Sequence, residues 1–204
     1  GAEARKVYRS LERDLIAEVQ AGEVTAANAL VKLLRLQQIT GGYIRTDEGR
    51  DVQIDSAKMN LLRDVMEDIA PDEPIVVFCR FHKDLEAVNR VADETGRRSL
   101  ELSGRIDELK RWQAGEAPVL AVQIDSGGVG VDLTRARYAI YYSLGFSLGS
   151  YEQSLARIHR PGQTRPVEYI HLLAEGTVDE KVMAALARRS DVVNTVLQQM
   201  KGLP

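Results

Sequence analysis

The chain has 204 residues and 44% of them are hydrophobic, which is enough for a proper core in one medium domain or two small ones. Lys and Arg number 27 against 30 Asp and Glu, giving a formal charge of −3, which excludes a global positive field that would attract nucleic acid. Cys79 is the single cysteine, and the chain has neither an 18-residue apolar run nor a signal-peptide pattern, which excludes an internal disulfide and a membrane span and favours an intracellular compartment.

The first part of the chain is predicted to be helical. It opens on Gly1-Ala2 instead of a methionine and goes straight into a helical pattern, so we expect this sequence to be part of a longer protein. Gly41-Gly42 ends the helical pattern, and the polar segment 43–53 indicates a loop or a short hairpin. Residues 1–54 are therefore interpreted as a helical N-terminal extension with a linker loop. Its two helices are expected at residues 2–20 and 25–38.

From residue 55 the pattern changes to short apolar runs that alternate with helical segments. This alternation is typical of a parallel sheet with crossover helices, so residues 55–204 are predicted to form an α/β domain of three layers with a mostly parallel sheet. Strands are expected at 75–79, 99–102, 119–124, 138–143 and 167–173. Helices are expected from Asp55 or Ser56 to Pro71, and at 81–95, 106–113, 151–160 and 178–200.

Two of these helices carry a sequence pattern for a capped start. Thr177 with Glu180 predicts a capping box for a single long helix that runs to about Met200. Ser150 with Gln153 matches the same pattern ahead of the helix at 151–160, which gives Gln153 a purely structural interpretation.

Two arginines close to a Pro-Gly break are the most informative feature. At about 100° per residue, Gln153, Arg157 and Arg160 fall within about 60° of one another on a helix surface. Like charges at this spacing repel, so the pair favours a polyanionic partner. Guanidinium groups bind phosphate oxygens in bidentate fashion, and in phosphoryl transfer such an arginine finger raises the rate by roughly 10³ to 10⁵. The alternative is a solvated basic patch paired with Glu152 or Glu168.

A glycine-rich loop follows the strand at 119–124. Glycines let backbone amides approach a phosphate closely, and the loop reads Ser126-Gly-Gly-Val-Gly130. It is not a dinucleotide fingerprint, because Leu133 stands where the third glycine would be needed. The chain contains no G-x-x-x-x-G-K-[ST] phosphate loop. A tight structural turn explains this loop equally well.

Several segments together resemble the second-lobe motifs of superfamily two helicases. The segment that ends in His159-Arg160-x-Gly162-Gln163 is similar to the Swi/Snf branch, and Leu34 to Thr40 (LRLQQIT) resembles the helix that precedes this lobe. The resemblance covers nearly the whole chain and implies the second RecA-like domain of a Swi/Snf-type DNA-dependent ATPase. The other matching segments are Ile75 to Phe81 (IVVFCRF), Leu102-Ser103-Gly104, Asp125 to Leu133 (DSGGVGVDL) and Gln153 to Gln163 (QSLARIHRPGQ).

The resemblance implies a role at the nucleotide for five residues. Arg157 and Arg160 would reach across a cleft to the γ-phosphate of ATP, with Gln153 assisting. Gly130 and Asp132 would lie beside the nucleotide sugar and phosphates. Ala156 and Pro161 differ from the residues most common in relatives, but neither difference removes a charged group.

The resemblance also implies partners that this sequence does not contain. The absent first lobe would hold most of the ATP and its Mg²⁺, so this chain alone should not hydrolyse ATP appreciably. No metal is expected on this chain, since its three histidines lack metal-ligand spacing. DNA, expected to be duplex, would be contacted through phosphates independently of sequence. The residues implied in that contact are Ser103, Gly104, Ser126 and Gly127.

Two hypotheses from other classes stay open at this stage. A non-catalytic nucleic-acid or protein-binding module that kept a helicase-like fold explains the missing phosphate loop as well as an absent first lobe does. A Rossmann-type oxidoreductase is suggested only by the glycine loop, and binding of NAD would be its test.

Overall fold

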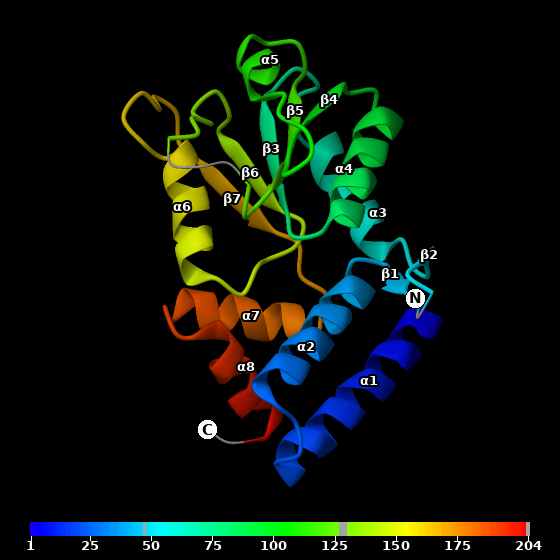
Figure 1. Cartoon of the computed structure of the whole chain (residues 1–204). Helices are drawn as coiled ribbons and strands as arrows, with labels where there is room; N and C mark the ends of the chain where they lie inside the picture. Colours follow the sequence, from blue (N-terminus) through cyan, green and yellow to red (C-terminus); the bar gives the residue numbers. More distant parts are fainter. Residues whose placement is uncertain (47, 127–129, 203–204) are drawn as a thin grey trace. The chain divides into compact units, whose positions relative to one another are not determined.

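The computed structural model describes residues 1–46, 48–126 and 130–202. The chain forms two compact units (Figure 1), which we call the sheet unit, residues 59–172, and the helical unit, residues 1–58 together with the described residues from Leu173 on. The motif-based division at residue 54 places residues 173–204 with the sheet. In the structure, the helices after Leu173 pack instead with the N-terminal helices. No helix among the described residues is long and apolar enough to cross a membrane.

The sheet unit is built on five strands that all run parallel, in the order β4-β5-β3-β6-β7. Helices cover both faces, so the predicted three-layer α/β fold with a parallel sheet is confirmed. The strands are β3 (Ile75–Cys79), β4 (Ser99–Leu102), β5 (Val119–Gln123), β6 (Tyr138–Tyr141) and β7 (Glu168–His171). The helices are α3 (Ala57–Glu67), which starts in the helical unit, α4 (His82–Glu94), α5 (Leu109–Gln113) and α6 (Leu148–Ile158).

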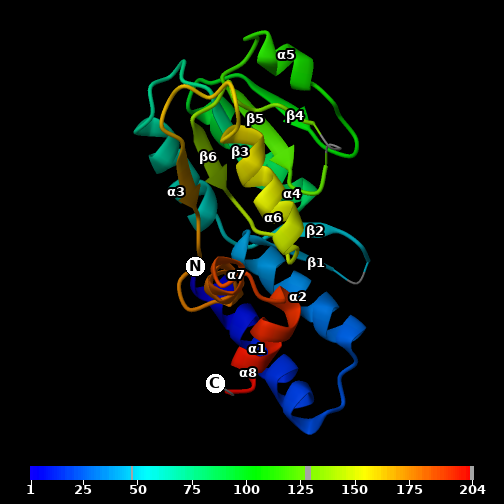
Figure 2. The same ribbon diagram turned by 90° about the vertical axis from the view of Figure 1, so that its left-hand side faces the viewer.

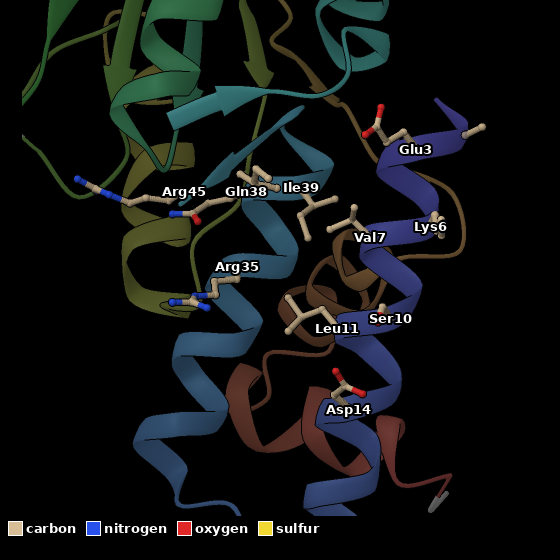
Figure 3. A pocket seen from close by; sticks show the side chains of 12 residues that line it. Glu3, Lys6, Val7, Ser10, Leu11, Asp14, Arg35, Gln38, Ile39 and Arg45 are labelled. Atoms are coloured by element: carbon tan, nitrogen blue, oxygen red, sulfur yellow. The ribbon is translucent and has the colours of Figure 1, made fainter. Parts of the chain in front are cut away.

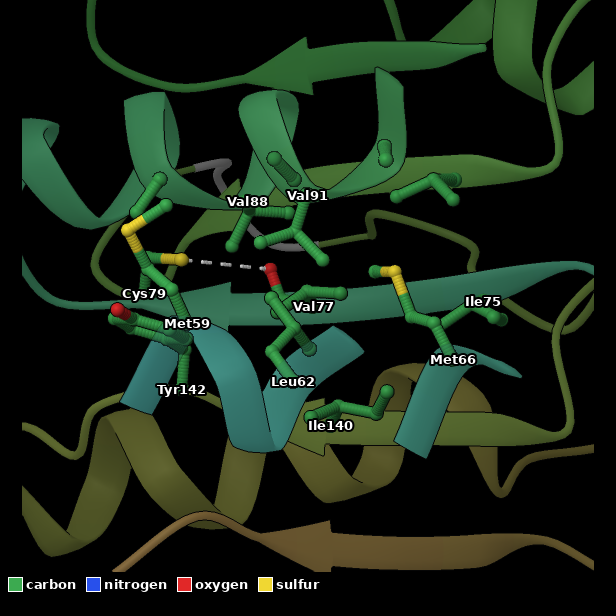
Figure 4. Close-up of a cluster of buried hydrophobic side chains, with 14 of the residues drawn as sticks. Met59, Leu62, Met66, Ile75, Val77, Cys79, Val88, Val91, Ile140 and Tyr142 are labelled. Atoms are coloured by element: carbon green, nitrogen blue, oxygen red, sulfur yellow. Dashed lines mark hydrogen bonds between the residues drawn. The ribbon is translucent and has the colours of Figure 1, made fainter. Parts of the chain in front are cut away.

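One face of this sheet forms a hydrophobic core with α3 and α4. Successive side chains of a strand point to opposite faces, so Ile75, Val77 and Cys79 of β3 lie on the same side. There they join Leu62 of α3 and Val88 of α4, and all five side chains are completely buried (Figure 4). The apolar run of β3 and the apolar faces of the two helices are therefore explained by one shared core.

The opposite face of the sheet carries α6, as the views in Figures 1 and 2 agree. Tyr141 of β6 stacks on Phe78 of β3, with 4.9 Å between the ring centroids. The Tyr141 hydroxyl lies 2.6 Å from the hydroxyl of Ser154 on α6, and both residues are buried. This buried hydrogen bond fixes α6 against the middle of the sheet.

Besides the start of α3, the described residues of the helical unit form four helices and a two-stranded hairpin. The predicted hairpin is present: β1 pairs antiparallel with β2. The Thr25 side chain caps the second helix by accepting a hydrogen bond from the backbone N–H of Asn28 at 3.2 Å. The elements are α1 (Ala2–Ala21), α2 (Ala26–Thr40), β1 (Tyr43–Arg45), β2 (Asp51–Gln53), α7 (Val178–Ala187) and α8 (Val192–Met200).

The prediction of a single final helix over 178–200 is wrong, because the structure has two helices there. Arg189 adopts a positive φ of 53°, and Asp191 starts a new helix by accepting the backbone N–H of Asn194 at 3.1 Å. The local capping potential of Asp191 thus competes with helix continuation. The predicted cap at Thr177 exists, but Glu180 accepts a hydrogen bond from the N–H of Gly176, one residue earlier than a capping box requires.

A buried ion pair lies inside the helical unit. The Lys58 ammonium is 2.6 Å from a carboxylate oxygen of Asp179, and their side chains are only 5% and 6% exposed. The other oxygen of Asp179 accepts a hydrogen bond from the Thr40 hydroxyl at 2.9 Å, and Asp179 also accepts the N–H of Ala174. The pair therefore ties the start of α3 to α2 and α7 through one carboxylate.

We predict that Asp179→Ala strongly destabilises the protein, because it leaves the Lys58 ammonium buried without its carboxylate. The free energy of unfolding should fall by about 3–5 kcal/mol, measured by chemical denaturation. The matched control is Glu48→Ala, which removes a carboxylate from an exposed ion pair with Arg50 in the same unit and should change it by less than about 1 kcal/mol. Equal effects of the two substitutions would contradict the assigned role of Asp179.

Candidate functional site

The carboxyl ends of all five strands lie at one edge of the sheet because the strands are parallel. Gln123, the last residue of β5, organises this edge. Its side-chain oxygen accepts hydrogen bonds from the backbone N–H of Gly104 at 3.1 Å and from the Ser126 hydroxyl at 3.0 Å. Gln123 therefore brings together two loops that the sequence separates by about twenty residues. Sequence reasoning missed it, and its position at a strand end ahead of a glycine loop is the only local signal.

Ser103 and Gly104 form part of a tight turn after β4. The Ser103 hydroxyl accepts the N–H groups of Arg105 and Ile106 at 3.1 and 3.2 Å, and it donates to Glu101 at 2.6 Å. This hydroxyl thus holds the turn, while Gly104 is exposed. Among the residues predicted to contact DNA, the structure brings Ser103, Gly104 and Ser126 together. Gly127 lies outside the described residues.

Helix α6 starts earlier and ends earlier than predicted. Its N-cap is Ser147, whose side chain accepts the N–H of Ser150 at 3.1 Å, so the capping box predicted at Ser150 and Gln153 is wrong. Gln153 is exposed on the helix, and the helix ends at Ile158. Arg160 therefore lies in the loop beyond the helix, and the prediction that it shares one helix face with Gln153 and Arg157 is also wrong.

Arg157 is buried at the end of α6, with 8% of its surface exposed. Its Nη1 donates to the backbone oxygen of Ser126 at 3.1 Å, and its own backbone oxygen accepts the N–H of Leu133 at 3.0 Å. Burial lowers the pKa of the guanidinium, which nevertheless stays protonated at neutral pH. Arg157 thus links α6 to both sides of the glycine loop.

Asp132 stands next to these arginines. Its carboxylate accepts the backbone N–H of Thr134 at 2.9 Å and the Thr134 hydroxyl at 2.7 Å. These two hydrogen bonds, and then the nearby charge of Arg160, hold the pKa of Asp132 below its usual value, so the carboxylate is ionised at neutral pH. Gly130 has a φ of 103°, a conformation that favours glycine. Asp132, Arg157 and Arg160 therefore gather around the same loop.

Gln163 fixes the loop that carries Arg160. Its side-chain amide donates to the backbone oxygens of Thr134 and Ala136 at 3.1 and 2.8 Å, and its side-chain oxygen accepts the N–H of Arg165 at 3.1 Å. Three of the four hydrogen-bonding positions of this amide are thus in use. The last residue of the arginine motif therefore anchors the loop of Arg160 to the segment that follows Asp132.

An aromatic cluster joins α6 to strands β6 and β7 of the sheet. The rings of Tyr141 and His171 stack with 4.6 Å between centroids and 3° between planes, and the Tyr151 hydroxyl lies 3.1 Å from Nε2 of His171. Burial lowers the pKa of His171. Among the described residues, no group of three His, Cys, Asp or Glu side chains could hold a metal ion. His171 is therefore best understood as a packing residue that positions α6.

The family model of the helicase conserved C-terminal domain matches residues 57–162, more than half of the chain. This chain belongs to the helicase conserved C-terminal domain family. The matched segment includes every described residue that was predicted for nucleotide or DNA contact, from Ser103 to Arg160. It stops one residue before Gln163.

This helicase-family chain is similar to protein p41 of Acyrthosiphon pisum secondary endosymbiont phage 1, with 28% identity over 98% of this chain and 44% of that protein. It is 26% identical to DNA repair protein RAD5 of Cryptococcus neoformans over 71% of this chain and 13% of that protein. The chain thus spans less than half the length of these relatives.

A solved structure of the Sulfolobus solfataricus SWI2/SNF2 ATPase core in complex with dsDNA shares the fold. Its TM-score is 0.65 at 20% identity, and the match covers 98% of this chain and 44% of that one. The predicted RecA-like fold is thereby confirmed, whereas the Swi/Snf type stays a prediction.

We predict that protonation of His171 destabilises the sheet unit. Its folded pKa is lowered, so the unfolded chain binds the proton more readily, and stability present above about pH 6.5 is lost as the pH falls below it. Between pH 8 and pH 6 the free energy of unfolding of the unmodified protein should fall by up to about 1 kcal/mol more than that of His171→Phe, which keeps an aromatic ring. Denaturation curves at both pH values test this, and equal losses in the two proteins would refute it.

Proposed function

We propose that this chain is the second lobe of a Swi/Snf-type ATP-dependent DNA translocase and that it supplies arginine fingers to ATP held by a first lobe. The observation that carries the proposal is the grouping of Arg157, Arg160 and Asp132 around the loop that follows β5, within the segment matched by the helicase family. Similarity to the SWI2/SNF2 ATPase core supports the Swi/Snf assignment, and similarity to DNA repair protein RAD5 supports action on DNA.

The two arginines are suited to different tasks. Arg160 is exposed and lies in a loop that Gln163 anchors, so it can reach a phosphate outside this chain. Arg157 is buried against the Ser126 carbonyl and holds the loop on which Asp132 stands. In phosphoryl transfer, a guanidinium offsets the charge that builds on the γ-phosphate. Arg160 would therefore be the finger in contact with phosphate, and Arg157 would combine finger and positioning roles.

The remaining nucleotide contacts would come from the neighbouring residues. Gly130 carries no side chain and adopts a positive φ, which leaves its backbone open to a phosphate. Asp132 is ionised and exposed, so it can accept hydrogen bonds from the sugar hydroxyls of ATP. Gln153 is exposed one turn before Arg157 and would assist the fingers. Mg²⁺ would be held mainly by the first lobe and the phosphates.

DNA would bind at the loops that Gln123 draws together. Gly104 is exposed there and Ser126 is partly exposed, and both are small enough for a phosphate backbone to approach. Contacts of this kind are independent of base sequence, as a translocating motor requires. Opening and closing of the cleft between two lobes during the ATP cycle would then move the protein along DNA inside the cell.

A non-catalytic binding module is favoured by one observation. Arg157 is buried and bonded to Ser126, as expected of a residue that only stabilises a loop. In such a module the DNA-facing loops would act without ATP hydrolysis. The two functions differ in what Arg160 does, because only a finger makes its charge necessary for turnover.

We predict that Arg160→Ala in the full-length protein lowers the kcat of DNA-stimulated ATP hydrolysis by about 10³ or more, because it removes the charge that stabilises the transition state. The DNA concentration that gives half-maximal stimulation should change little. The matched control is Arg165→Ala, which removes an exposed arginine of the same loop that pairs with Glu73. Its kcat should stay close to that of the unmodified protein. Near-normal turnover by Arg160→Ala would rule out the finger assignment.

A further inference from the structure

A face of α1 is made of cations without acidic residues. At about 100° per residue, Arg5, Arg9 and Arg13 lie within about 80° of arc and extend over about 12 Å along the helix, and Lys6 adds a fourth cation about 20° further on. The acidic residues of α1 fall outside this arc: Glu3, Glu12, Asp14 and Glu18. We call Arg5, Lys6, Arg9 and Arg13 the basic face of α1.

All four side chains of the basic face are exposed. Arg9 forms an ion pair with Glu12 at 2.6 Å, but Glu12 is itself buried and also lies 4.0 Å from the ammonium of Lys181. Within the described ranges 1–46, 48–126 and 130–202, Arg5, Lys6 and Arg13 form no ion pair with an acidic side chain. Three of the four charges on this face are therefore not offset by an ion pair within the described part of the chain.

The fold does not require these cations, because α1 packs through its other sides. Its contacts with the rest of the helical unit are made by buried residues such as Tyr8 and Leu15. Figure 3 shows Val7 and Leu11 on the side of α1 that faces α2, where a groove of about 850 Å³ lies, and Lys6 stands at the edge of the basic face where it also lines this groove. Arginines spaced four residues apart repel one another, so the face is unfavourable unless a polyanion covers it.

We propose that the basic face of α1 is a second DNA-binding surface that contacts the phosphate backbone. The proposal rests on the proposed function, because a DNA translocase has DNA as its polyanionic partner. The whole chain carries a charge of −3, so attraction to DNA has to come from local surfaces of this kind. Several cations within about 12 Å suit a polymer with one phosphate per 3.4 Å along each strand. The helical unit would thus bind the DNA backbone independently of base sequence.

The test compares two double variants of the full-length protein that lose the same charge from the same unit. Arg5→Gln with Arg13→Gln removes two cations that have no acidic partner, whereas Arg45→Gln with Arg50→Gln removes two cations that are paired with Asp51 and Glu48. The affinity for a duplex of random sequence is measured between 50 and 300 mM salt, with heat denaturation as a check that each variant folds. The slope of log K against log salt reports the number of phosphates contacted, at about 0.9 per phosphate.

We expect the slope to become less steep by about two for the Arg5 and Arg13 variant and to stay unchanged for the Arg45 and Arg50 variant. An unchanged slope in both, or equal changes in both, would overturn the proposal. If the unmodified protein binds DNA and hydrolyses ATP, the proposed function stands, whatever slopes the two variants give. Unmodified protein that shows no DNA-stimulated hydrolysis would refute the proposed function itself, and a slope difference between the variants would still support the DNA-binding face.

Discussion

Parallel pairing of five strands is the constraint from which the site follows. In the register observed, Ile75 of β3 lies opposite Val119 of β5 and Tyr138 of β6, so these neighbouring strands start level and deliver their carboxyl ends to one edge. A parallel sheet must be covered on both faces, which explains the continuous apolar run of β3 and the helices on either side. Loops at the carboxyl edge are left free of the core and can carry the groups that are proposed to bind phosphates.

A small number of hydrogen bonds converts this edge into a defined arrangement of groups. Gln123 joins the turn at Gly104 to the loop at Ser126, and Gln163 joins the loop of Arg160 to the segment after Asp132. Neither glutamine carries a charge. Behind them, the hydroxyl pair of Tyr141 and Ser154 holds α6 on the sheet. The charged groups therefore depend on neutral amides and hydroxyls for their positions, as preorganised sites generally do.

Much of the fold could be predicted from the sequence because it depends on local patterns. Runs such as Ile75 to Cys79 are apolar throughout and have the length of a buried strand, and all five strands were found close to their true bounds. The family motifs also identified Arg157, Arg160 and Asp132, which the structure brings to one loop. The roles assigned to these residues stay predictions.

What the sequence could not provide depends on tertiary contacts or on competing caps. The end of α6 at Ile158 moves Arg160 off the helix, and the cap at Asp191 divides the last helix in two. The pairing of Lys58 with Asp179 joins residues 121 positions apart, which no local pattern can reveal. Gln123 was overlooked because its significance comes from Gly104, on another loop. Periodicity predicts helices well, but it does not tell where a cap or a distant partner will end them.

The measurement that tests the central claim most directly is ATP hydrolysis, with and without duplex DNA, by this chain alone and by the same chain joined to its native upstream segment. If the chain is the finger-bearing half of a two-lobe motor, hydrolysis appears only in the joined protein and rises with DNA, because the fingers need nucleotide and Mg²⁺ held by the other lobe. Absence of hydrolysis in both proteins, or equal hydrolysis by the chain alone, would contradict it.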